Sequence, residues 1–222
     1  MKFTDSPVIS LPIGDKSLTI EQDNGSMHVG TSVWPCSLVV AKFVERWVLS
    51  TSPQPENPYS FLFPLRSRRA IELGSGCGPA GMALALLGLD VTLTDIAPVM
   101  PALKRNLKRN LRCFSGVTKP RAVQLYWNNE QQVRALKPPF DFVIATDVVY
   151  LENGVEPLLM TMEKLCGPES VVLLGYQLRS PEADRLFWEM CPRFFRVEKV
   201  RHEDLHPEYA FDETDVFILR KI

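Results

Sequence analysis

The chain has 222 residues, of which 45% are hydrophobic, and its formal net charge at pH 7 is −1. This length suits one α/β domain with a full core, and the hydrophobic content excludes a chain that is disordered throughout. The near-zero charge argues against a surface that coats nucleic acid or a membrane.

The N-terminal residues contain no apolar signal region, and no apolar run is long enough to cross a bilayer. The five cysteines form no C-x-x-C pair, and the three histidines do not cluster with them. We therefore expect reduced, mostly buried thiols, with neither a disulfide framework nor a metal site. The protein is expected in the cytoplasm, or in the cytoplasm and the nucleus.

Residues 1–68 are predicted to form an N-terminal extension that packs on the core. Alternating residues predict a short strand at 17–22 before an Asn24-Gly25 turn, and a helical period predicts a helix at 33–49. A stretch rich in proline and serine at 50–67 predicts a surface loop of unknown role.

Residues 69–222 show the regular alternation of a Rossmann-like core, and we expect one domain overall. Six strands and five helices are predicted to alternate before a final strand: strands at 69–74, 90–95, 121–127, 140–147, 170–177, 194–200 and 215–221, and helices at 79–88, 97–111, 128–136, 152–166 and 181–190. Alternation predicts parallel crossovers with helices on both faces. Because a polar loop at 202–213 joins the last two strands, we expect a seven-stranded, mostly parallel sheet with one antiparallel strand.

The motif ELGSGCG, residues Glu72–Gly78, lies between a strand and a helix. Gly74 and Gly76 let the backbone turn sharply and approach a ligand, and the helix N-terminus offers free N–H groups. Asp95 ends the next strand, where its carboxylate can accept hydrogen bonds from both ribose hydroxyls. A plain tight turn is the alternative, because isolated glycine motifs are weak evidence.

The same motif distinguishes two classes of nucleotide ligand. The dehydrogenase fingerprint G-x-G-x-x-G needs a glycine where Pro79 stands, and proline removes an N–H from a phosphate-binding helix start. Glu72 places a negative charge where a pyrophosphate is unfavourable but a sulfonium or ammonium group is favourable. These features favour S-adenosylmethionine over a nicotinamide dinucleotide, which stays the alternative.

The segment FDFVIATDVVYLE predicts a buried strand that places polar side chains at its carboxyl end. Thr146 and Asp147 emerge there, beside Gly74 and Asp95, and Tyr150 follows three residues later. A lysine amine, with a reference pKa of about 10.4, must lose a proton before it attacks a methyl group. A carboxylate can bind the ammonium, and a tyrosine can desolvate and orient the amine. The alternative is a helix cap by Asp147 and a core tyrosine.

These motifs, together with LYW at 125–127 and GTSVWPCSLVVAKFVE at 30–45, resemble the seven-β-strand S-adenosylmethionine-dependent methyltransferases. More narrowly, residues 28–176 are similar to the family 16 protein-lysine methyltransferases, in the methyltransferase-like 21 group. The D-x-x-Y tetrapeptide, Asp147–Tyr150, is the more specific feature, and the glycine motif marks only the superfamily. Cys77 and Pro79 depart from many relatives, which affects fine packing more than the class of cofactor.

The resemblance implies roles for individual residues. The cofactor-binding candidates are Trp34 at the methionine end, Glu72, Gly74, Ser75 and Gly76 at the turn, Asp95 at the ribose, Trp127 at the adenine, and Thr146 beside the cofactor. Asp147 and Tyr150 are the candidate catalytic residues at the lysine entrance. Trp34 and Trp127 can alternatively be ordinary core aromatics, since large aromatics dominate cores.

The implied activity is transfer of a methyl group to a lysine of a non-histone protein, such as a chaperone, an ATPase or an elongation factor, with S-adenosylhomocysteine as product. We expect a monomer that acts without a metal. The alternatives are methylation of a small molecule, arginine or nucleic acid, and a non-catalytic binding scaffold. The basic run at 104–110 has leucines opposite its charges, which predicts a solvated helix face rather than a nucleic-acid site.

Overall fold

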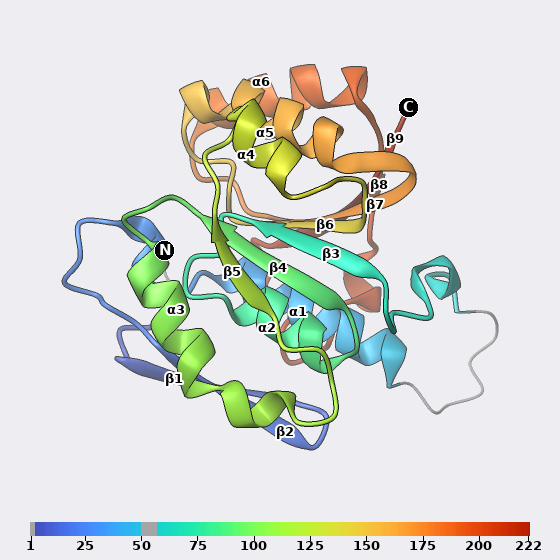
Figure 1. The fold of residues 1–222 in the computed structure, drawn as a ribbon. Helices are drawn as coiled ribbons and strands as arrows, with labels where there is room; N and C mark the ends of the chain where they lie inside the picture. The colour runs from blue at the N-terminus through green and yellow to red at the C-terminus, as the bar shows by residue number, and fades with distance from the viewer. Residues whose placement is uncertain (1–2, 50–56) are drawn as a thin grey trace.

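The computed structural model describes residues 3–49 and 57–222 (Figure 1). Its main sheet has seven strands in the order β5-β4-β3-β6-β7-β9-β8. These strands are β3 (Arg69–Leu73), β4 (Asp90–Asp95), β5 (Arg121–Gln124), β6 (Phe140–Thr146), β7 (Cys166–Tyr176), β8 (Phe195–Lys199) and β9 (Asp215–Lys221). The helices are α1 (Pro35–Val48), α2 (Pro79–Leu86), α3 (Met100–Arg109), α4 (Glu130–Ala135), α5 (Glu152–Leu165) and α6 (Pro181–Met190).

The sheet is parallel except at β9. Strand β3 pairs in parallel with β4 and β6, β4 with β5, and β6 with β7. Strand β9 is antiparallel to both of its neighbours, β7 and β8. The predicted seven-stranded, mostly parallel sheet with one antiparallel strand is therefore confirmed, because a chain that returns without a crossover helix must reverse its direction.

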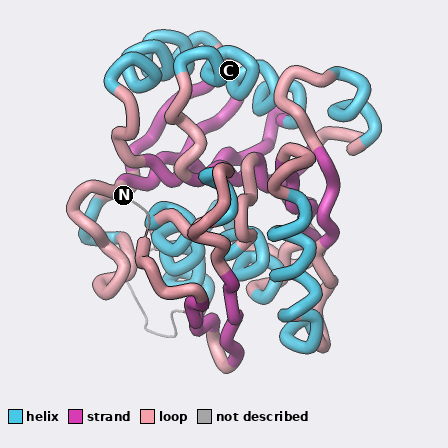
Figure 2. The backbone as a smooth tube through the Cα atoms, turned by 90° about the vertical axis from the view of Figure 1, so that its left-hand side faces the viewer, coloured by secondary structure: helices cyan, strands magenta, loops and turns pink. Residues whose placement is uncertain are grey.

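Helices cover both faces of the sheet, as Figure 2 shows in a view turned by 90°. Successive residues of β6 face opposite ways: Phe142 and Ile144 pack with α1, α2 and α3, whereas Val143 and Ala145 pack with α4, α5 and α6. Both faces of a central strand are thus buried, which explains its nearly continuous apolar sequence.

A second, two-stranded sheet precedes α1 and was only half predicted. Strand β2 (Lys16–Glu21) corresponds to the predicted strand, and it pairs antiparallel with β1 (Val8–Ile13), which the sequence reasoning missed. In β1 the buried Ile9, Leu11 and Ile13 alternate with exposed residues. This period of two was a usable strand signal.

Helix α3 binds the open edge of β2 through two asparagine side chains. Oδ1 of Asn106 accepts the N–H of Glu21 at 2.8 Å, and its Nδ2 donates to the carbonyl of Glu21 at 2.9 Å. Asn110 makes the same two bonds to Thr19 at 2.8 and 2.9 Å. Arg105 also contacts the carboxylate of Glu21, at 3.0 Å. The prediction of a simply solvated basic face is therefore wrong in part.

Several segments differ from their predicted bounds. Strand β5 ends at Gln124 rather than at residue 127, and β7 begins at Cys166 rather than at residue 170. Helix α3 begins at Met100 rather than at residue 97, after a turn at residues 97–99. Of the predicted loop at 50–67, residues 50–56 lie outside the described part, and the remainder includes a 3-10 helix at Ser60–Leu62. Within the described ranges, every helix is too short or too polar to span a bilayer.

Candidate active site

A cavity of about 820 Å³ opens at the carboxyl ends of β3, β4 and β6. Parallel neighbours end at the same edge of a sheet, so their following loops meet there. Nine of the ten predicted site residues line this cavity, namely Trp34, Gly74, Ser75, Gly76, Asp95, Trp127, Thr146, Asp147 and Tyr150. Glu72 is the exception.

The glycine turn has a backbone that only glycine adopts readily. Gly74 and Gly76 have φ angles of +63° and +55°. A Cβ atom at Gly76 would lie 2.8 Å from the carbonyl oxygen of Gly30, and one at Gly74 would lie 2.9 Å from Val148. Any side chain here would push the turn away from its neighbours, so both glycines are required for the shape of the cavity.

Asp95 is held by the backbone of the turn. Its Oδ2 accepts the N–H of Gly76 at 2.7 Å, and its Oδ1 accepts the N–H of Ile96 at 2.8 Å. Burial raises the pKa of Asp95, and these two hydrogen bonds oppose that rise. Since two carboxylate oxygens offer about four acceptor positions, Asp95 can still accept two hydrogen bonds from a ligand.

Glu72 has a different place from the one predicted. It is fully buried, and its Oε2 accepts the N–H of Gly81 in α2 at 3.1 Å. Burial raises the pKa of Glu72 to about 8, so the side chain is mostly protonated at neutral pH. It therefore presents no full negative charge to the cavity. The physical reason is strand alternation, because Glu72 shares the α2 side of β3 with Ala70.

Asp147 occupies a left-handed turn after β6, with a φ of +56°. Its side chain is 4% exposed and forms an ion pair with Arg179, whose Nη2 lies 2.5 Å from Oδ1. Its Oδ2 accepts the backbone N–H of Cys36 at 2.9 Å. Asp147 thus caps the N-terminus of α1, as the alternative interpretation expected, while it also lines the cavity.

Tyr150 is 38% exposed and lines the cavity, which does not fit a core tyrosine. Its pKa is raised, first by burial and then by the negative charge of Asp95. The hydroxyl is therefore protonated at physiological pH and available as a donor or an acceptor. Because Tyr150 and the glycine turn line the same cavity, they lie at the same edge of the sheet.

Two aromatic side chains stand on the cavity wall, and one of them, Trp127, also packs against the core on the α5 side. Trp34 is half-buried, and its Nε1 donates to the carbonyl of Val29 at 2.9 Å. Trp127 is half-buried between the glycine turn and α5, where a Cβ at Gly154 would lie 3.6 Å from its ring. Both rings are thus fixed at their edges, and their other surfaces line the cavity.

Cys77 also lines the cavity, but burial raises the pKa of its thiol to about 12. A thiol with so high a pKa is a poor nucleophile at neutral pH. The turn therefore uses Cys77 as a small residue and not as a nucleophile.

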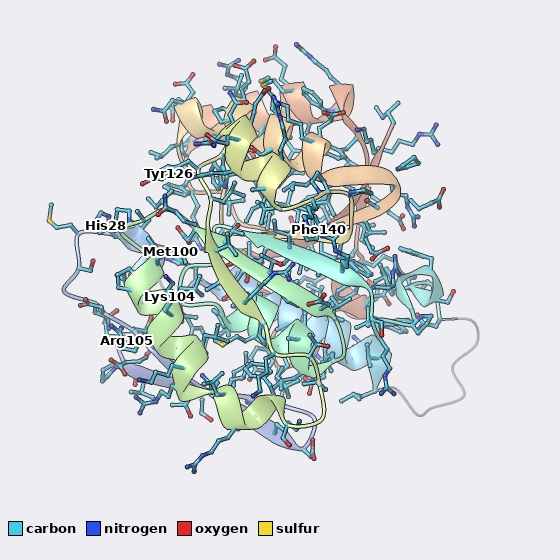
Figure 3. The ribbon with its side chains drawn as sticks, in the orientation of Figure 1. His28, Met100, Lys104, Arg105, Tyr126 and Phe140 are labelled. Atoms are coloured by element: carbon cyan, nitrogen blue, oxygen red, sulfur yellow. The ribbon has the colours of Figure 1, made fainter. Side chains whose placement is uncertain are left out.

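Several residues of the site were missed by the sequence reasoning. His28 and Tyr126, which are labelled in Figure 3, line the mouth of the cavity from segments almost 100 positions apart in the chain. Arg179 lines it three residues after β7 ends. Strand β7 is the parallel neighbour of β6, so its loop reaches the same edge, but the sequence alone did not predict the order of these two strands.

Comparisons with known proteins agree with this geometry. A family model described as lysine methyltransferase matches residues 13–194. Protein N-lysine methyltransferase METTL21A of Mus musculus is 32% identical over 206 residues, which cover 90% of this chain and 85% of that protein. EEF1A lysine methyltransferase 3 of Xenopus tropicalis is 28% identical over 186 residues, which cover 83% and 75%.

Solved structures establish the fold. The 16S rRNA N2 G1207 methyltransferase RsmC of T. thermophilus, in complex with AdoMet and guanosine, superposes with a TM-score of 0.63 at 18% identity, over 97% of this chain and 50% of that one. A TehB-like SAM-dependent methyltransferase from Corynebacterium glutamicum gives 0.54 at 20% identity, over 82% and 98%. The sheet therefore has the Rossmann-like fold that these two methyltransferases share. Since the family model spans most of the sequence, the chain belongs to the lysine methyltransferase family.

Proposed function

We propose that this chain transfers a methyl group from S-adenosylmethionine to the side-chain nitrogen of a lysine in another, non-histone protein. The observation that carries the proposal is that one cavity is lined by the glycine turn, by Asp95 and by the pair Asp147 and Tyr150. A cofactor and an acceptor side chain can therefore meet inside it.

The residues of the cavity fit the cofactor. Asp95 keeps acceptor positions for the two ribose hydroxyls, because its backbone partners use only two. Gly30, Gly74 and Gly76 line the cavity with backbone and no side chains. In this proposal, Trp127 flanks the adenine, Trp34 flanks the methionine end, and Ser75 and Thr146 line the space between them.

S-adenosylmethionine supplies, when bound, a methyl group on a cationic sulfur and leaves as S-adenosylhomocysteine. The chain's own residues position and desolvate the lysine. Tyr150 offers a protonated hydroxyl to the amine, and the carboxylate of Asp147 lies beside it in a charge-balanced pair with Arg179. Positioning of this kind favours direct transfer without a covalent enzyme intermediate. The lysine proton goes to solvent before the transfer.

The rim of the cavity favours a protein as substrate. Several of its lining side chains are large, apolar and exposed, namely Met27, Val29, Ile96, Tyr126 and Leu151. Exposed apolar groups around a cleft are typical of protein-binding surfaces. The relatives named above are protein-lysine methyltransferases, one of them acting on EEF1A by its name. We therefore propose a folded partner such as an elongation factor, a chaperone or an ATPase.

The basic residues of α3 do not favour nucleic acid as the substrate. Arg105 and Arg109 both contact the carboxylate of Glu21 in β2, at 3.0 and 2.9 Å. Their charges are thus partly used to hold the hairpin. No aromatic side chain interleaves the run at 104–110 to stack on bases.

The test is incubation of the purified chain with methyl-labelled S-adenosylmethionine and a protein extract depleted of methylation, followed by mass spectrometry. We expect label on lysine side chains, and about tenfold less label with Asp95→Ala at limiting cofactor. Label on arginine, nucleic acid or a small molecule would contradict the lysine assignment. In a parallel thermal-shift assay S-adenosylhomocysteine should stabilise the chain, and stabilisation by a dinucleotide alone would overturn the cofactor assignment.

A further inference from the structure

Four residues from three separate segments form a closed series of contacts at the cavity wall, which we call the contact ring: Trp34, Cys36, Asp147 and Arg179. Nε and Nη2 of Arg179 donate to Oδ1 of Asp147 at 3.0 and 2.5 Å. Oδ2 of Asp147 accepts the backbone N–H of Cys36 at 2.9 Å. The guanidinium carbon of Arg179 lies 4.8 Å from the ring centroid of Trp34, which closes the series.

The ion pair in the contact ring is largely buried. The side chains of Arg179 and Asp147 are only 12% and 4% exposed. A desolvated charge is costly when it loses its partner, so each of the two holds the other in place. Gly175 in β7 allows α1 to pack close to the sheet, because a Cβ atom at position 175 would lie 3.0 Å from the carbonyl oxygen of Cys36. The first turn of α1 therefore rests directly on the sheet.

The contact ring also replaces a missing helix cap. Trp34 stands at the N-cap of α1 and makes no side-chain cap bond, because an indole has no acceptor atom. Asp147 supplies the acceptor from the end of β6 instead. The indole is thereby left to face the cavity, with its position fixed by Arg179 on one side and by Val29 on the other.

We propose that Arg179 is a positioning residue for the methyl transfer, which holds the carboxylate of Asp147 and the indole of Trp34 in the geometry that receives the lysine. It acts through these two side chains and not by contact with the reacting atoms. By balancing the charge of Asp147, it also keeps that carboxylate from strongly favouring a protonated amine. The proposal rests on the proposed function above.

The first test needs no substrate. Hydrogen exchange of the backbone amide of Cys36 is measured in the wild type, Arg179→Gln, Asp147→Ala and the double variant. We expect faster exchange in each single variant, and exchange in the double variant equal to that of Asp147→Ala. Additive effects of the two substitutions, or no effect of Arg179→Gln, would overturn the proposal.

Arg201→Gln is the control, because it also removes a guanidinium from a buried carboxylate, here from an arginine whose side chain is 65% exposed. Arg201 donates to both oxygens of Asp204, at 2.8 and 3.1 Å, and the carboxylate side chain is 7% exposed. Neither residue lines the cavity. This variant should leave the exchange of Cys36 and the labelling rate unchanged. If Arg201→Gln changed the exchange of Cys36 and the labelling rate as much as Arg179→Gln does, a general loss of stability would explain both variants. That result would contradict the proposal.

The second test measures label transfer to methylation-depleted extract at saturating S-adenosylmethionine. Arg179→Gln should lower the rate by about 10²-fold, the loss expected for a misplaced site, while affinity for S-adenosylhomocysteine stays within about threefold. Arg179→Lys keeps the charge but not the planar fork, so it should restore part of the rate. If Arg179→Gln fails to fold, both tests use Arg179→Lys instead. Wild-type exchange of Cys36 and wild-type labelling in Arg179→Lys would then overturn the proposal.

The two tests separate this proposal from the proposed function. If the wild-type chain puts no label on lysine, the proposed function fails, while the exchange measurements still decide whether Arg179 orders the contact ring. If the wild type labels lysine and Arg179→Gln labels it at the same rate, the positioning role alone is contradicted.

Discussion

The two carboxylates that line the cavity have different partners and therefore different predicted roles. Asp95 binds only backbone N–H groups, whereas Asp147 binds a guanidinium and a helix terminus. We predict that Asp95→Ala weakens S-adenosylhomocysteine affinity by about tenfold or more, because two charge-assisted hydrogen bonds are lost. Asp147→Asn should keep this affinity but lower label transfer by at least about tenfold. Isothermal titration and the labelling assay measure the two effects, and equal losses of affinity in both variants would contradict this division.

Glu72 gives a prediction about pH and stability. The pKa of its carboxyl is about 8 in the folded chain and near the ordinary value of 4.5 when unfolded. Between these values the folded state holds a proton that the unfolded state has lost, so rising pH lowers the free energy of unfolding. Glu72→Gln removes this pH dependence. The free energy of unfolding of the wild type should therefore fall, relative to that of the variant, by up to about 1.4 kcal/mol per pH unit.

Urea unfolding at pH 5.5, 7 and 8.5 measures the difference between wild type and Glu72→Gln. The exposed Glu198→Gln is the control, since it removes a carboxylate without touching the core. We expect the gap between wild type and Glu72→Gln to widen up to about pH 8 and then to stay constant. Parallel curves for these two chains would show that Glu72 is not a buried, protonated carboxyl.

At the scale of elements, the docking of α3 on the β1-β2 hairpin depends on two buried asparagines. Asn106 satisfies both the N–H and the carbonyl of Glu21, and an alanine there would leave both groups without a partner. We predict that Asn106→Ala lowers the free energy of unfolding by about 2–3 kcal/mol. Lys108→Ala, on the exposed side of the same helix, should change it by less than about 0.5 kcal/mol. Equal losses of unfolding free energy in Asn106→Ala and Lys108→Ala, measured by urea unfolding, would contradict this role of Asn106.

The elements themselves were predictable where the chain has a strong local period. Strand β6 and helix α6 follow from their apolar patterns, and the turn at Gly74 and Gly76 follows from residue chemistry. Contacts between distant segments were not predictable in this way. The role of Asn106 requires the pairing of α3 with β2, and that of Arg179 requires the order of β6 and β7. The buried position of Glu72 could have been predicted, because successive side chains of β3 point to opposite faces of the sheet.

At the scale of the whole molecule, the cavity opens to the surface through an apolar rim that is predicted to contact the protein substrate. Leu151 is 54% exposed and lines the mouth. Leu151→Ser should lower labelling of extract proteins by about 3–10-fold, as for a contributing interface residue, with unchanged affinity for S-adenosylhomocysteine. Leu49→Ser is the control, because Leu49 is 49% exposed and lies outside the cavity lining. Equal labelling by both variants would contradict a substrate contact at this rim.

The central claim is that one cavity at the carboxyl edge of the sheet holds the cofactor and the acceptor lysine side by side. A crystal structure of the chain with S-adenosylhomocysteine tests it most directly. The account predicts that the ribose hydroxyls bind Asp95, that the adenine lies against Trp127, and that the sulfur points toward Tyr150 and Asp147. A ligand bound outside this cavity, or one whose sulfur points away from Tyr150, would contradict it.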